Sequence, residues 1–300
     1  MRGERILLDN LICPEGPRWH DGLLYVADFY AWEVVWCDLD GGHGRHLHVP
    51  GRPSGMGWLP DGRMMVVSMR DACVLLYDGA EVDAVVDLSA WTPCTNEMIV
   101  DGRGRAYVGG MRNVYADRFD TADLAPDAAA GGRLEDLYLV ELAENGKDLR
   151  VRTVARELNF PNGTVITPDG KTLIIAESMA QRLTAFDIAE DGSLDRRRVW
   201  AQLNGVPDGI CLDAEGCVWV AMCFPVDARA LCRVAEGGGI RNVIGTDRVP
   251  MAVALGGPER DLIFLVESQV VGVGSEPGLR CRGNGRVRTG RVSVPGAGVP

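Results

Sequence analysis

The chain has 300 residues, of which 46% are hydrophobic and 24% charged, a composition typical of a soluble globular protein. Its formal net charge of −11 argues against nucleic acid or an anionic membrane as a partner. No apolar run is long enough to span a bilayer, and the opening MRGERILLDN lacks the apolar stretch of a signal peptide. We therefore expect a cytoplasmic protein that acts on a small molecule, and the sequence leaves its oligomeric state open.

The cysteine and glycine content agrees with this interpretation. The nine cysteines form no Cys-x-x-Cys pair, and their number is odd. Free thiols in a reducing cytosol are therefore favoured over a disulfide framework. The 38 glycines suit a chain with many tight turns better than one with long helices.

A strand–turn–strand pattern recurs six times along the chain. Each copy joins a short apolar strand, a turn that usually contains Gly, and a strongly apolar second strand, as in FPNGTVITPDGKTLIIAES. In chain order the copies begin at Pro14, Arg52, Thr95, Phe160, Val206 and Val249. Their spacing of roughly 40–50 residues, with one longer gap, is typical of β-propeller blades.

The segments between the copies each read as two further strands around a polar turn. Four strands per unit and six units predict an all-β fold, a six-bladed β-propeller with four antiparallel strands per blade, as a single domain over 1–300. The N-terminal RILLDN is a strand that could complete the last blade. The longer gap holds an insertion around 113–133, which we expect to form a loop or lid on one face. A β-sandwich is the competing fold, and six copies in one register argue against it.

Six equivalent positions along the repeats carry unusual residues. They lie four places before the apolar residue that precedes each turn, and they are Glu15, Ser54, Asn96, Asn162, Asp208 and Met251. Because a propeller arranges its innermost strands around one channel, these side chains are expected to converge at one mouth of it. Two carboxylates and two amides are oxygen donors that suit a hard divalent cation whose shell is completed by water. Asn162-Gly163 alone is typical of a turn, but the common register favours a metal site.

Several motifs, in order, resemble the gluconolactonase / regucalcin (senescence marker protein) family. They are EGPRW, TNEMIVDGRGRAYVGG, FPNGTVITPDGKTLIIAES, VPDGICLDAEGCVWVAM and the closing VPGAGVP. The resemblance extends from about Leu7 to Pro300. It implies a six-bladed propeller with one catalytic divalent cation, whose ligands would be Glu15, Asn162 and Asp208. It also implies hydrolysis of a sugar-acid lactone, with Asp208 as the candidate base that activates water.

The resemblance places a substrate side next to the metal. The family's substrate-side Asn falls on Asn96, Glu97 stands where Asp is usual, and Cys94 stands where sugar-lactone members commonly have Arg. Cys cannot make the forked, charged contact of Arg, and the ring positions Ser54 and Met251 add little charge. A sugar-acid (aldono) lactone is the default substrate. A less hydroxylated lactone, an ester or another cyclic substrate is the alternative.

Two further questions stay open at this point. Oxygen ligands and water serve Ca²⁺, Zn²⁺, Mn²⁺ and Mg²⁺ all to some degree, so the sequence does not choose the cation. A non-enzymatic propeller, such as a calcium-binding regulator, is the competing class of function. Converging acids and amides at one level of the channel favour the hydrolase.

Overall fold

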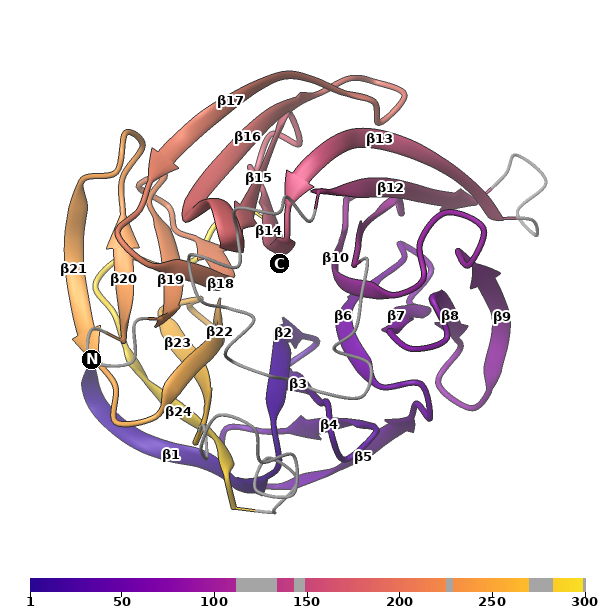
Figure 1. Ribbon diagram of the computed structural model, residues 1–300. Helices are drawn as coiled ribbons and strands as arrows, with labels where there is room; N and C mark the ends of the chain where they lie inside the picture. Colours follow the sequence, from indigo (N-terminus) through magenta and orange to yellow (C-terminus); the bar gives the residue numbers. More distant parts are fainter. Residues whose placement is uncertain (112–133, 143–148, 225–228, 270–282, 299–300) are drawn as a thin grey trace.

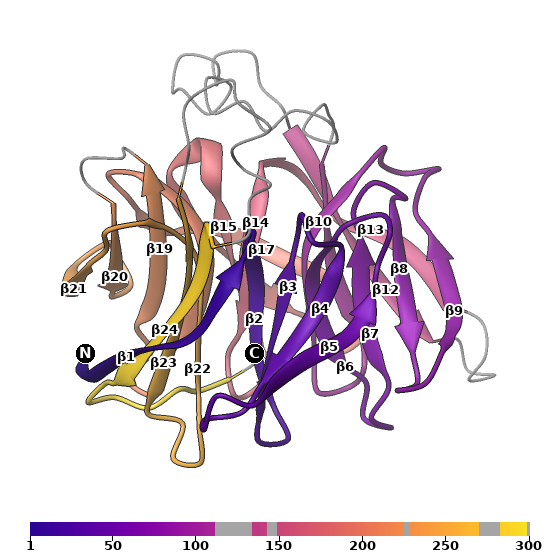
Figure 2. The ribbon, with the colours of Figure 1, turned by 90° about the horizontal axis from the view of Figure 1, so that it is seen from below.

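The computed structural model describes residues 1–111, 134–142, 149–224, 229–269 and 283–298. They form six four-stranded antiparallel sheets set radially around a central axis, which confirms the predicted six-bladed β-propeller (Figure 1). Seen after a 90° turn, the inner strands run along this axis (Figure 2). The predicted insertion at 113–133 lies outside the described residues.

The first three blades follow one another along the chain, each with its strands ordered from the centre to the rim. Their strands are β2 (Pro14–His20), β3 (Leu23–Asp28), β4 (Glu33–Cys37), β5 (His43–His48), β6 (Pro53–Trp58), β7 (Met64–Ser68), β8 (Cys73–Tyr77), β9 (Val82–Asp87), β10 (Thr95–Val100), β11 (Ala106–Gly110), β12 (Leu134–Leu142) and β13 (Leu149–Asn159).

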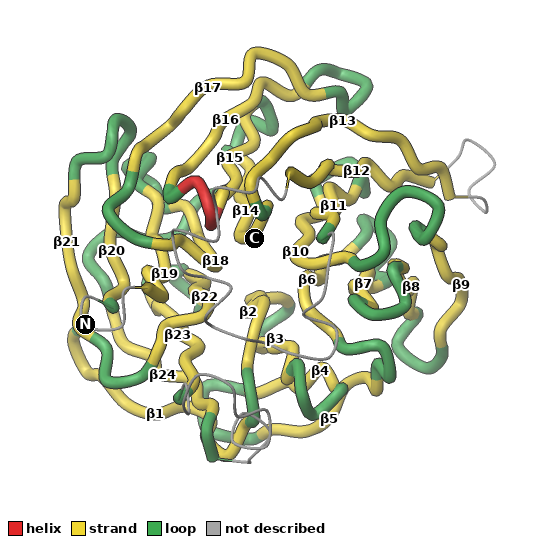
Figure 3. Tube along the Cα trace, viewed as in Figure 1, coloured by secondary structure: helices red, strands yellow, loops and turns green. Residues whose placement is uncertain are grey.

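The other three blades continue in the same way. Their strands are β14 (Pro161–Ile166), β15 (Thr172–Glu177), β16 (Arg182–Ile188), β17 (Leu194–Gln202), β18 (Val206–Leu212), β19 (Val218–Phe224), β20 (Ala230–Val234), β21 (Ile240–Gly245), β22 (Val249–Gly256), β23 (Leu262–Ser268) and β24 (Gly285–Arg291). A single 3₁₀ turn, η3 (Ser178–Ala180), follows β15 and is drawn red in Figure 3. Within the described ranges, no helix is long and apolar enough to cross a membrane.

The two ends of the chain share the last blade. The N-terminal strand β1 (Arg2–Leu11) pairs antiparallel with β24 and forms the outermost strand of the sheet that contains β22 and β23. This confirms the predicted closure by RILLDN. Leu7, Leu8 and Leu11 are buried in the apolar cluster of this blade, whereas Ile6 is 48% exposed.

We expect Leu8→Ala to lower the free energy of unfolding by about 2–3 kcal/mol, because it removes buried methyl groups from the strand that closes the ring. Ile6→Ala, two residues away on an exposed position, is the matched control and should change it by less than about 0.5 kcal/mol. Urea titrations of the two variants measure the difference. Equal effects would contradict the role of β1 in closure.

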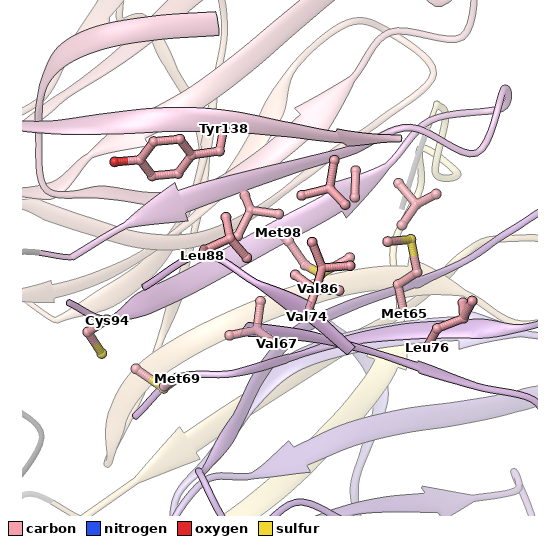
Figure 4. Packing of buried hydrophobic residues seen from close by; sticks show 14 of the residues in the cluster. Met65, Val67, Met69, Val74, Leu76, Val86, Leu88, Cys94, Met98 and Tyr138 are labelled. Atoms are coloured by element: carbon pink, nitrogen blue, oxygen red, sulfur yellow. The ribbon is translucent and has the colours of Figure 1, made fainter. Parts of the chain in front are cut away.

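The core consists of the apolar faces between neighbouring blades. In one cluster, Met65 and Val74 of the second blade pack with Met98 and Tyr138 of the third (Figure 4). Because both faces of each sheet are covered by neighbours, the strands of the blade interior are apolar almost throughout. The inner strands β2, β6, β10, β14, β18 and β22 contact one another in sequence around the channel.

Buried acids hold the chain where it enters some of the inner strands. The Asp28 carboxylate, at the end of β3, accepts hydrogen bonds from the backbone N–H groups of Ile12 and Cys13 at 2.9–3.1 Å. Glu177, at the end of β15, accepts the N–H of Asn159 at 2.8 Å. These bonds fix the starts of β2 and β14, the strands that carry Glu15 and Asn162.

Candidate metal and substrate site in the central channel

One cavity at an end of the channel gathers the six predicted positions. They are the channel ring, which consists of Glu15, Ser54, Asn96, Asn162, Asp208 and Met251. Each is the second or third residue of an inner strand, so all six lie at one level. The cavity and its mouth contain about 990 Å³ of space not filled by atoms, with open solvent at the mouth included.

A repeated backbone irregularity places these side chains. Every inner strand has a register shift against its neighbour where the ring residue lies, within 15–18, 53–56, 95–98, 161–164, 207–210 and 250–252. Such bulges re-aim side chains and are frequent near functional sites. The ring is therefore a product of six similar distortions and not of six independent turns.

The glycines that follow several ring residues serve close packing and not turn geometry. A Cβ at Gly163 would lie 2.5 Å from the backbone nitrogen of Ile210, and one at Gly209 would lie 2.2 Å from the Cβ of Ala252. Gly55 is equally crowded by the next blade. The X-Gly dipeptides thus reflect how closely the inner strands approach one another, and the turn interpretation does not apply.

The two carboxylates of the ring line the same cavity, where Asp208 is buried and Glu15 is partly exposed. Burial raises the pKa of Glu15 well above its usual value, and the nearby carboxylates of Asp208 and Glu97 raise it further. Burial and the charge of Glu97 likewise raise the pKa of Asp208 to about 8. Among the described residues, no Arg, Lys or His lines the cavity. A cation placed between Glu15 and Asp208 would relieve this electrostatic cost.

The amides of the ring are oriented by hydrogen bonds. Asn162 donates from Nδ2 to the Ser178 hydroxyl at 3.2 Å, and that hydroxyl donates to the carbonyl of Pro207 at 2.7 Å. Asn96 donates from Nδ2 to the carbonyl of Pro161 at 3.3 Å. Because the nitrogens face protein acceptors, each amide oxygen is left to act as a ligand or acceptor.

The donor set fits a hard divalent cation. In the described part of the chain, no three His, Cys, Asp or Glu side chains gather as a metal site. The ring instead offers the carboxylates of Glu15 and Asp208 and the amide oxygens of Asn162 and Asn96. Four oxygen donors with room for water match the preferences of Ca²⁺, Mg²⁺ and Mn²⁺ better than those of Zn²⁺ in its usual nitrogen and sulfur sites.

Two residues predicted on the substrate side lie elsewhere. Cys94 and Glu97 are not among the described residues that line the cavity. Cys94 is buried in the apolar cluster with Met69 and Met111, because a small apolar thiol packs well there. Glu97 occupies the position that is glycine in four other blades and extends to Arg18, with Nη2 and Oε2 3.1 Å apart. Both residues therefore shape the cavity from behind it.

Sequence reasoning missed two supporting residues. Arg18 was part of the EGPRW motif, but its partner lies 79 residues away and could not be read from spacing. Ser178, which orients Asn162, follows the acid that ends β15, and Ser268 follows Glu267 in the same way at the end of β23. This repeated Glu-Ser pair was the available signal.

The fold and the site define a class of protein, a six-bladed propeller with an acidic, oxygen-lined site in its channel. The family model described as "SMP-30/Gluconolactonase/LRE-like region" matches residues 13–269. The chain belongs to this family, as its motifs led us to expect.

Several proteins similar to this one cover most of its length. A pentonolactonase of Haloferax volcanii is 26% identical over 307 residues, covering 95% of this chain and 92% of that protein. Regucalcin of Bos taurus is 26% identical over 227 residues, covering 73% of this chain and 71% of that protein. The calcium-binding protein regucalcin from Agrobacterium tumefaciens superposes with a TM-score of 0.76 at 18% identity, covering 100% of this chain and 97% of that chain. The last likeness shows the shared fold.

Proposed function

We propose that the protein is a metal-dependent lactonase, a hydrolase that opens the ring of a small lactone. Glu15, Asn162 and Asp208 would hold one divalent cation, and Asn96 would face the substrate. The observation that carries the proposal is the pair of carboxylates in the channel, Glu15 and Asp208. Both have a raised pKa, and no cationic side chain is found in the described lining of the cavity. The pentonolactonase relative supports the reaction class.

The side chains of the ring suit the steps of ester hydrolysis. When bound, the cation would polarise the lactone carbonyl and stabilise the charge that develops on its oxygen. Asp208 would accept a proton from the attacking water. The second N–H of the Asn96 amide can donate to a substrate oxygen while the first stays on Pro161. Ser178 keeps Asn162 in place throughout.

The direct test is hydrolysis by protein stripped with EDTA, followed by proton release. Ca²⁺, Mn²⁺, Mg²⁺ and Zn²⁺ would be added back singly, with a panel of aldonolactones and simple γ-lactones. Turnover that returns with a cation is the expected result. A folded protein that binds a cation but hydrolyses no lactone would favour the second candidate, a calcium-binding propeller, which the regucalcin relatives suggest.

We expect the affinity for the cation to depend on pH. With no cation bound, Asp208 has a raised pKa of about 8, so below that pH a proton occupies the carboxylate and must leave before a cation binds. The pKa of Glu15 is also raised, so a proton on that carboxylate must leave as well. The apparent affinity should therefore rise at least about tenfold per pH unit between pH 6 and pH 8. Calorimetric titrations with Ca²⁺ or Mn²⁺ at four pH values measure this, and a flat profile would contradict it.

A further inference from the structure

Two apolar walls stand on either side of the channel ring. Both consist of lining residues that belong to the hydrophobic clusters between blades. The first wall, from the first to third blades, is Phe29, Met69 and Met111, with Tyr30 and Phe160 packed against it. The second, from the fifth and sixth blades, is Val206, Cys223, Val249 and Met251, with Phe224 packed against it. Most of the cavity surface is therefore apolar.

A buried guanidinium lies over two aromatic rings of the first wall. The guanidinium of Arg52 lies 5.3 Å from the ring centroid of Phe29 and 5.1 Å from that of Tyr30, a cation–π arrangement. Arg52 is only 3% exposed and is not among the described lining residues. It stiffens an aromatic surface and offers no forked contact to a substrate in the cavity.

The described lining offers a polyol few polar groups, and its charged side chains are the two ring carboxylates of Glu15 and Asp208. One N–H of each of the Asn96 and Asn162 amides and the hydroxyl of Ser178 already donate to protein acceptors. The second N–H groups of these amides, with Ser54, Ser268 and Gln269, are left for substrate hydroxyls. The ring oxygens are those expected to bind the cation. A sugar-acid lactone brings several hydroxyls, and each one left without a partner in a buried site costs about tenfold in binding or more. An apolar substituent meets no such cost and removes wall surface from water.

We propose that the cavity selects a lactone whose ring carries an apolar alkyl or aryl substituent over a polyhydroxylated sugar-acid lactone. This substrate class rests on the lactonase function proposed above. The lactone carbonyl lies at the oxygen donors of Glu15, Asn162 and Asp208. The substituent lies between the two walls, against Phe29 on one side and Phe224 on the other.

The test compares lactones of one ring size with the metal-loaded protein. γ-Butyrolactone, γ-caprolactone and γ-octalactone lengthen the alkyl group, and D-ribono-1,4-lactone replaces it with hydroxyls. We expect kcat/KM to rise about fourfold per added methylene. The rise from γ-butyrolactone to γ-octalactone, which adds four carbons, should therefore be about 250-fold, and D-ribono-1,4-lactone should rank below γ-octalactone.

Two variants assign the chain-length effect to the wall. Phe224 is half-buried at the end of β19 and lines the cavity, so Phe224→Ala should flatten the dependence on chain length. Trp58 is an equally half-buried aromatic residue at the opposite end of the channel, where β6 ends. Trp58→Ala is the matched control and should keep the dependence. Loss of the dependence in both variants would overturn the assignment.

The outcomes separate the two proposals. A flat response to chain length, or a preference for D-ribono-1,4-lactone, overturns the apolar substrate class and leaves the lactonase function standing. If no lactone is hydrolysed with any cation, the lactonase function fails. Calorimetric titration of the same protein with the matching γ-lactams then tests the walls alone. Tighter binding with a longer alkyl group supports the apolar selectivity, and equal affinity overturns it.

Discussion

Asp208→Asn is expected to reduce kcat/KM for lactone hydrolysis about a thousandfold or more. The substitution keeps the size of the side chain and removes its charge. The charged carboxylate has two proposed roles, as a cation ligand and as the group that takes a proton from water. The amide of Asn162 still finds Ser178, so the ring should otherwise keep its shape. Initial rates at saturating cation measure the loss of catalysis, and calorimetry measures the loss of cation affinity.

Asp213→Asn is the matched control for this variant. Asp213 directly follows β18, the strand that carries Asp208, and is also buried. Its carboxylate does not line the cavity and instead accepts a hydrogen bond from Nε of Arg233 at 2.6 Å. We expect it to lower the free energy of unfolding by about 1–3 kcal/mol and to leave kcat/KM within about threefold. An Asp208→Asn variant as active as Asp213→Asn would contradict the proposed role of Asp208.

Arg18→Met is expected to give the largest loss of stability of any single change considered, about 3–5 kcal/mol. Arg18 joins three blades, because its guanidinium donates to the carbonyl of Met56 at 3.1 Å, to that of Met98 at 2.9 Å and to the Glu97 carboxylate. Removing it leaves Glu97 buried without its partner, and one oxygen of Glu97 already lacks a hydrogen bond. Urea unfolding measures the loss.

The pH dependence distinguishes a lost ion pair from lost packing. Burial already raises the pKa of Glu97, and Arg18 opposes that rise. Without Arg18 the folded pKa rises further above the unfolded value, so the penalty is largest at high pH and is relieved as Glu97 takes up a proton in acid. The loss should be smaller at pH 5 than at pH 8, and Arg18→Met/Glu97→Gln should recover more than half of it. A loss independent of pH would argue for packing instead.

The fold could be predicted from the sequence because the same local pattern recurs six times. A strand, a turn and a second apolar strand are local features, and their regular spacing leaves few architectures that bury every strand. The same register identified the channel ring, since residues at equivalent places on inner strands must face one axis. Strand β1 was predicted for the same reason, as the last blade otherwise lacked its outer strand.

The contacts that the ring residues and their sequence neighbours make could not be predicted, because these contacts form between blades. Cys94 and Glu97 are neighbours of Asn96 in sequence, yet Cys94 packs in an apolar cluster between blades and Glu97 pairs with Arg18 of another blade. Glycine after Asn162 suggested a turn, while the structure shows a strand pressed against the next blade. The two apolar walls combine residues of several blades, so only the folded chain brings them together.

The most direct measurement is an anomalous difference map from crystals of the protein grown with Mn²⁺. We expect one strong peak in the channel, in coordination contact with the carboxylates of Glu15 and Asp208 and the amide oxygen of Asn162. The peak should disappear in Asp208→Asn. A channel without a peak at millimolar Mn²⁺, or a cation bound only outside the ring, would contradict the claim that these residues form a catalytic metal site.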